Sequence, residues 1–169
     1  FGATVDGVIE LAARQVMATF VPPSVTVSIT KPSADAQQNR HIVATVRRQL
    51  RGDALAWVYL GHGHPASLDA VPTANGPRAM LTVDDLRHWP RATTNHVGPL
   101  AVIIACYTGS FDGPRDCLAE HLLKQPHGPV AVVAATRVSM PYGNAVIGSE
   151  LLRAQFELDA TTLGSTWLQ

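Results

Sequence analysis

Two reactive side chains each stand directly after a hydrophobic run of this sequence. The stretch WVYLGHGHP, residues 57–65, ends its apolar run at His62, which lies between two glycines. The stretch LAVIIACYTGSF, residues 100–111, ends its apolar run at Cys106. A cysteine attacks as its thiolate, and an imidazole can accept the thiol proton near neutral pH. We therefore predict that Cys106 is a nucleophile and that His62 is its base.

Gly63 follows the histidine and adds a second element of acyl-transfer chemistry. A glycine lets a substrate backbone approach closely, and its N–H group can reach a reacting carbonyl without an obstructing side chain. The N–H group of Cys106, at the start of the turn CYTGSF, is a natural second donor. The sequence thus predicts an oxyanion hole formed by the backbone N–H groups of Gly63 and Cys106.

Helical and strand-like segments alternate along the chain, and this order has to place the two side chains. The spacing of apolar residues predicts helices over residues 4–20, 33–50, 81–89, 114–125 and 142–156, with the start of another in 161–169. Apolar or alternating runs predict strands over residues 25–30, 54–60, 97–105 and 128–136. This alternation requires a mostly parallel sheet covered by helices on both faces, a three-layer α/β/α sandwich. His62 and Cys106 then stand at carboxyl ends of parallel strands, where open sheets bind their ligands.

Three positions outside this pair have structural interpretations. Thr82 is the expected N-cap of the helix over 81–89, with Asp85 at the capping-box position. Trp57 is expected in the core of its strand. Cys117, the other cysteine, is expected to be a small core residue on the inner face of its helix rather than half of a disulfide.

Composition limits the classes of function. The chain has 169 residues, of which 46% are hydrophobic, and its 13 basic and 13 acidic residues cancel. That length fits one domain over residues 1–169, and zero net charge gives no footprint for nucleic acid or an anionic membrane surface. The longest apolar stretches fall well short of the roughly 20 residues that span a bilayer. Two cysteines are too few for a disulfide framework, and the cellular compartment stays open.

The two strand-end motifs carry a resemblance to a known family. A hydrophobic strand ending in His-Gly, then a second ending in Ala-Cys, resembles the caspase-like cysteine peptidases of clan CD. GHG together with ACYTGSF is most similar to the gingipain-type, C25-like peptidases, and ACYTG also resembles CHAT domains. The likeness extends over about residues 53–156. The family's first core strand and closing elements have no counterpart here, so we expect a fold that is incomplete at one or both ends and a piece of a larger protein.

This resemblance implies an endopeptidase that works through a thioester acyl-enzyme. Cys106 would be the nucleophile and His62 its partner, with no metal or organic cofactor. The expected partners are a protein or peptide substrate and further domains or a second subunit of the same protein. The loop after the strand beside the cysteine strand should wall the pocket for the substrate's P1 side chain, and the substrate-binding candidates are Arg137, Val138, Ser139, Met140 and Asp112. Arg137 would favour an acidic P1 residue, and Asp112 a basic one.

Two other functions stay open from the sequence. The chain could be an inactive caspase-like interaction module that keeps the fold and the motif without turnover. It could also be a zinc-dependent hydrolase, because His62, His64 and Cys106 offer three side chains of the types that bind zinc. An electrophile directed at Cys106 separates the enzyme from the module, and a chelator tests the zinc hydrolase.

Overall fold

The computed structural model describes residues 3–52, 54–89, 98–158 and 161–168. The chain divides into two compact units, which are described separately: Phe1–Ile29 with Met140–Gln169, and Thr30–Ser139. The elements in chain order are α1 (Ala3–Phe20), η1 (Gln38–His41), α2 (Ile42–Leu50), β1 (Ala56–Leu60), β2 (Gly63–His64), β3 (Ser67–Leu68), β4 (Ala70–Val71), β5 (Arg78–Ala79), α3 (Val83–Arg87), β6 (Gly98–Ile104), α4 (Leu118–Leu123), β7 (Pro129–Ala134), α5 (Pro141–Phe156) and α6 (Leu163–Trp167).

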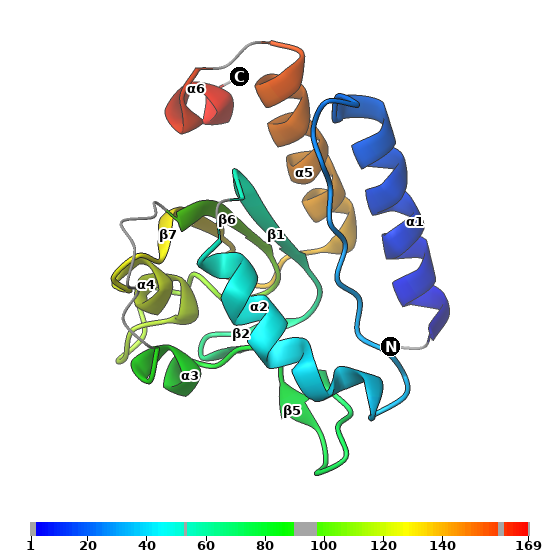
Figure 1. Ribbon diagram of the computed structural model, residues 1–169. Coiled ribbons are helices and arrows are strands. Elements are labelled where there is room, and N and C mark those ends of the chain that lie inside the picture. The colour runs from blue at the N-terminus through cyan, green and yellow to red at the C-terminus, as the bar shows by residue number, and fades with distance from the viewer. Residues whose placement is uncertain (1–2, 53, 90–97, 159–160, 169) are drawn as a thin grey trace. The chain divides into compact units, whose positions relative to one another are not determined.

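A parallel sheet forms the centre of the unit Thr30–Ser139. Its strands lie in the order β1-β6-β7, and both neighbouring pairs run parallel (Figure 1). In the register of β1 and β6, Ala56 lies opposite Leu100 and Leu60 opposite Ile104. These three strands lie within the apolar runs predicted as strands over 54–60, 97–105 and 128–136, of which residue 97 lies outside the described residues. The predicted α/β class with a mostly parallel sheet is confirmed.

The core of this unit lies on one face of the sheet. Strand side chains alternate between faces, and along β1 Trp57 and Tyr59 are buried whereas Val58 is 57% exposed. Trp57 is therefore a core residue, as predicted. Helices α2, α3 and α4 contribute to the same hydrophobic cluster, whose largest fully buried members include Leu50, Leu81, Leu86, Ile103, Leu118 and Leu122.

Helix α3 begins at the predicted cap. The Thr82 side chain accepts a hydrogen bond from the Asp85 N–H at 3.0 Å, and the Asp85 carboxylate accepts one from the Thr82 N–H at 2.9 Å. The same carboxylate pairs with Arg47 of α2 at 2.5 Å. The capping box is confirmed, and through Asp85 it also ties α3 to α2.

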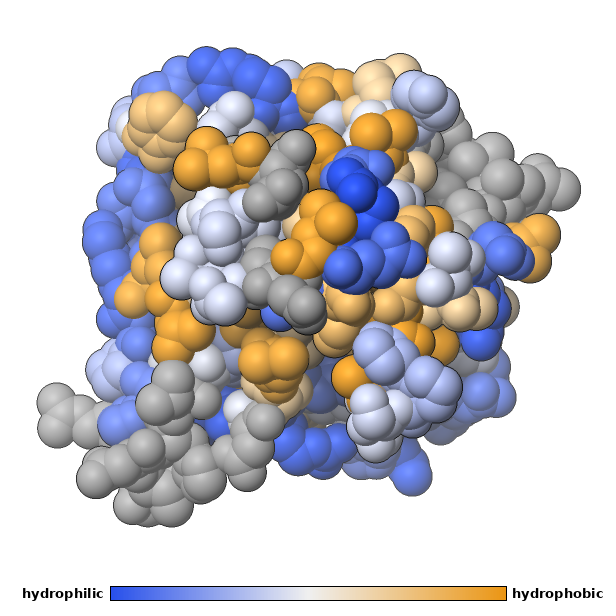
Figure 2. Space-filling model, turned by 90° about the horizontal axis from the view of Figure 1, so that it is seen from above, coloured by the Kyte–Doolittle hydropathy of each residue, from blue (hydrophilic) through white to orange (hydrophobic). Residues whose placement is uncertain are grey.

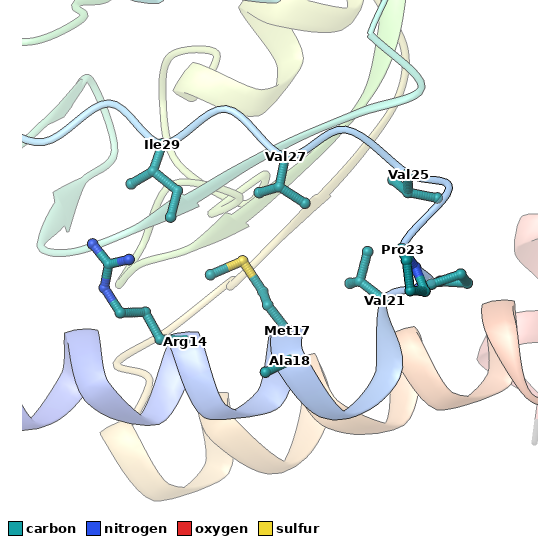
Figure 3. Close-up of a pocket in the computed structure, with 9 residues that line it drawn as sticks. Arg14, Met17, Ala18, Val21, Pro23, Val25, Val27 and Ile29 are labelled. Carbon is teal, nitrogen blue, oxygen red and sulfur yellow. The ribbon is translucent and has the colours of Figure 1, made fainter.

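The prediction of a strand over residues 25–30 is wrong. These residues are extended but pair with no strand among the described residues. Figure 3 shows Val27 and Ile29 turned toward Met17 of α1, and these side chains line a groove of about 320 Å³. The alternating pattern did predict an extended chain with one apolar side, but that side faces a helix.

Two predicted helices begin several residues later than expected. The helix predicted over 33–50 is preceded by a turn, and the α-helical part begins at Ile42. Asn39 is 2% exposed, accepts a hydrogen bond from the Ser33 N–H at 2.8 Å and donates one to the Pro72 carbonyl at 2.9 Å. These bonds hold the chain before α2 in a turn. Likewise, the helix predicted over 114–125 is limited to α4.

The other unit contains helices that the sequence predicts over residues 4–20, 142–156 and 161–169. Helices α1 and α5 contact each other within it, and α5 contacts α6. None of the helices in the described part of the chain combines the length and apolar character needed to cross a bilayer. Figure 2 shows hydrophobic residues in several groups, with hydrophilic residues between them, on the face it presents.

Candidate active site

The histidine and the cysteine follow neighbouring parallel strands at the same edge of the sheet. Leu60 and Ile104 are register partners at the carboxyl ends of β1 and β6, and His62 and Cys106 each come two residues later. The pairing extends one step beyond β1, because the Gly61 N–H donates to the Ile104 carbonyl at 3.3 Å. His62 is exposed and Cys106 half-buried. The structure thus brings the two predicted residues to one rim.

The chain at Gly63 packs directly against the cysteine turn. A methyl group built on Gly63 would lie 2.6 Å from Cγ2 of Thr108, 2.7 Å from the Cys106 carbonyl oxygen and 2.8 Å from Cβ of Ala105. Side chains do not tolerate such short contacts, so only glycine fits at this position. The absence of a side chain next to His62 is therefore explained by the cysteine turn beside it.

The cysteine turn has an unusual backbone and several supports. Tyr107 has a φ of 60°, a left-handed conformation that a bulky residue adopts only when its surroundings enforce it. Its N–H donates to the Arg137 carbonyl at 3.1 Å, and the Gly109 N–H donates to the Ala135 carbonyl at 2.9 Å. The chain that follows β7 therefore runs alongside the turn and fixes where Cys106 stands.

The first turn of α4 joins the histidine segment to the cysteine turn. The Leu118 N–H donates to the Pro65 carbonyl at 2.7 Å, and the Ala119 N–H donates to the Thr108 carbonyl at 3.0 Å. Cys117, just before the helix, is 1% exposed, and burial raises the pKa of its thiol. It is a core residue, as predicted, but the predicted place on the inner face of the helix is wrong, because α4 begins at Leu118 and Cys117 is its N-cap residue. Both cysteines are free thiols.

Three polar groups of Ser139 lie within hydrogen-bond distance of the Cys106 sulfur. Its N–H lies 3.4 Å and its hydroxyl oxygen 3.7 Å from Sγ, and its carbonyl accepts from the thiol at 3.5 Å. The sequence places Ser139 only in a loop that walls a substrate pocket. The structure places it within hydrogen-bond distance of the Cys106 sulfur.

Arg137 and Asp112 form a bidentate ion pair with each other. The two guanidinium nitrogens lie 3.0 and 2.6 Å from the two carboxylate oxygens. The hydrogen bonds from Arg137 hold the pKa of Asp112 below its usual value. Val138, between Arg137 and Ser139, is 59% exposed, whereas Met140 belongs to the other unit. Contact of these residues with a substrate stays a prediction.

Tyr59 is a supporting residue that the sequence reasoning missed. Its side chain is buried, donates to the His62 carbonyl at 2.9 Å and accepts from the Asp69 N–H at 3.2 Å. Burial raises the pKa of Tyr59, so this hydroxyl stays protonated and available as a donor. A tyrosine on the inner side of a strand requires a polar partner, and this was the available signal.

The described residues give no geometric support to a zinc site. No three histidine, cysteine, aspartate or glutamate side chains among them lie close enough together to hold a metal ion. His64 instead accepts a hydrogen bond from the Ala66 N–H through Nδ1 at 3.2 Å.

The comparison with protein families gives a match over nearly the whole chain. The model of peptidase family C25 matches residues 9–169. The chain belongs to peptidase family C25. The predicted likeness to gingipain-type peptidases is therefore confirmed.

A solved structure supports the caspase-like α/β fold of this C25 chain. The crystal structure of the Arg-specific cysteine proteinase gingipain R (RGPB) matches with a TM-score of 0.55 at 19% sequence identity. The match covers 95% of this chain and 34% of that one, so the chain spans about a third of the length of the proteinase it resembles. The search of curated proteins found no matching sequence.

Proposed function

We propose that this C25 chain carries the catalytic centre of a cysteine endopeptidase, with Cys106 as nucleophile and His62 as proton acceptor and donor. Membership of a peptidase family supports the reaction class. The close approach of Gly63 to the Cys106 carbonyl supports the choice of residues more than any other observation. It brings the segment that carries the imidazole against the turn that carries the thiol.

The proposed reaction has two half-reactions. The Cys106 thiol gives its proton to the His62 imidazole, and the thiolate attacks the scissile carbonyl carbon. The imidazolium then protonates the leaving amine as the C–N bond breaks, which leaves a thioester on Cys106. A water molecule loses its proton to His62 and attacks the thioester. The C–S bond then breaks, the acid product leaves, and His62 returns the proton to the Cys106 sulfur. The N–H groups of Gly63 and Cys106 are the proposed donors to the oxyanion.

Substrate selection by charge is proposed to be weak in this chain. Asp112 and Arg137 neutralise each other, so a charged P1 side chain has to open their ion pair before it binds either partner. Exposed pairs of this kind contribute little to stability, so acidic and basic P1 side chains meet the same small barrier and neither is favoured over the other. Uncharged P1 side chains meet no such barrier.

Cleavage of a peptide library by the complete protein tests this function. We expect cleavage that is lost in Cys106→Ala and in His62→Ala. His64→Ala is the matched control, because His64 is exposed and lies two residues from His62. A zinc hydrolase that uses His62, His64 and Cys106 would lose activity in all three variants and with a chelator. Absence of cleavage by the folded complete protein would instead favour an inactive interaction module.

A further inference from the structure

The contacts of Ser139 with the Cys106 sulfur point to a role beyond that of a pocket wall. Two donors, the backbone N–H and the side-chain hydroxyl, lie 3.4 and 3.7 Å from Sγ. The Ser139 carbonyl accepts from the protonated thiol at 3.5 Å. When the thiol loses its proton, it no longer donates to the Ser139 carbonyl. The Ser139 N–H and hydroxyl can still donate to the sulfur, which now carries a negative charge.

Backbone hydrogen bonds and an ion pair hold the segment before Ser139 against the cysteine turn. The chain before it is fixed by backbone bonds to the cysteine turn, from Gly109 to Ala135 at 2.9 Å and from Tyr107 to Arg137 at 3.1 Å. The ion pair between Asp112 and Arg137 joins the same two segments. A change confined to the Ser139 side chain removes the hydroxyl donor and none of these three interactions.

We propose that Ser139 is a catalytic residue that stabilises the thiolate of Cys106 through its N–H and its hydroxyl. Hydrogen bonds donated to the charged form of an acid favour that form. The proton released by the thiol goes to His62, and the negative charge on sulfur is held by Ser139 until the sulfur attacks. The contribution of this charge stabilisation to peptide cleavage rests on the proposed peptidase function, whereas its effect on the thiol does not.

The pH dependence of alkylation by iodoacetamide measures this effect, because only the thiolate reacts. Modification of Cys106 is followed by mass spectrometry of its peptide, in the complete protein and in Ser139→Ala and Ser139→Thr. Near neutral pH, Ser139→Ala should react about threefold to tenfold more slowly, since a hydrogen bond to the charged form is lost. At strongly alkaline pH the thiol is ionised in every variant, so the rates should converge. Ser139→Thr keeps the hydroxyl and should restore the original profile.

Ser110→Ala is the matched control for this experiment. The Ser110 hydroxyl belongs to the same turn but donates to the Tyr107 carbonyl, at 2.9 Å. Its loss should leave the alkylation profile unchanged. An unchanged rate in Ser139→Ala at neutral pH would overturn the proposal, and so would an equal fall at every pH or the same fall in Ser110→Ala. Absence of peptide cleavage with the expected alkylation profiles would refute only the peptidase.

Discussion

Replacement of Gly63 by alanine probes the closest contact between the histidine segment and the cysteine turn. The added methyl group would lie 2.6 Å from Thr108 Cγ2, 2.7 Å from the Cys106 carbonyl oxygen and 2.8 Å from Ala105 Cβ. Two of these three atoms belong to side chains without flexible ends, and the third belongs to the backbone. No neighbour can turn away, so the two segments have to separate.

The size of the required separation sets the expected effect. Ordinary contacts begin at 3.4 Å, so the closest of the three needs a shift of about 0.8 Å. Overpacking of this kind lowers the free energy of unfolding by about 1–3 kcal/mol. A displacement near 1 Å between reacting groups lowers the rate by about 10²-fold. We therefore expect kcat/KM of Gly63→Ala to fall by about 10- to 100-fold.

The assay compares Gly63→Ala with Gly113→Ala in the complete protein. Gly113 lies in the loop after the same cysteine turn, and a methyl group there would meet its nearest neighbour, the Arg115 carbonyl, at 3.6 Å. This variant should keep both kcat/KM and the free energy of unfolding, measured with denaturant. If Gly63→Ala keeps both quantities as well, the two segments do not pack as described and the reasoning is refuted.

Three further substitutions test individual interactions. Tyr59→Phe removes the hydrogen bonds of this hydroxyl to the His62 carbonyl and the Asp69 N–H, so the free energy of unfolding should fall by about 1–3 kcal/mol and kcat/KM should fall with it. Unchanged kinetics would contradict a role in holding His62. Thr82→Ala removes the cap of α3 and should lower the free energy of unfolding by about 1 kcal/mol without changing kcat/KM, whereas an unchanged denaturation midpoint would refute the cap's contribution. Arg137→Ala should return the pKa of the Asp112 carboxyl toward 3.8, which a carboxyl NMR titration measures. Because the pair lowers that pKa, its stabilisation is present above pH 3.8 and is lost as the pH falls through the lowered value; a titration identical in both proteins would contradict the pairing.

The rim of the sheet could be predicted because it depends on few, strong signals. Apolar runs such as LAVIIA indicate buried strands, and parallel strands place their carboxyl ends together. The position of His62 and Cys106 at one edge of the sheet follows from these two facts alone. The cap at Thr82 was likewise predictable, because capping depends on residues that are close in sequence.

The structural features that the sequence did not predict depend on contacts between segments that are distant in sequence. The alternation in residues 25–30 indicates one apolar side, but it does not say whether a sheet or a helix faces that side. The turn before α2 depends on Asn39 and the carbonyl of Pro72, which are far apart in sequence. The contacts of Ser139 with Cys106 likewise join two loops that are distant in sequence. Arg137 and Asp112 pair with each other, whereas the sequence suggests each separately as a residue that selects the P1 side chain.

The most direct test of the central claim is covalent trapping of the nucleophile by a peptidyl chloromethyl ketone in the complete protein. The proposed peptidase should carry the label on Cys106, located by mass spectrometry, and the labelling should disappear in Cys106→Ala and fall steeply in His62→Ala. His64→Ala should be labelled at the original rate. A label on Cys117 or no label at all would contradict the account, and so would undiminished labelling of Cys106 in His62→Ala.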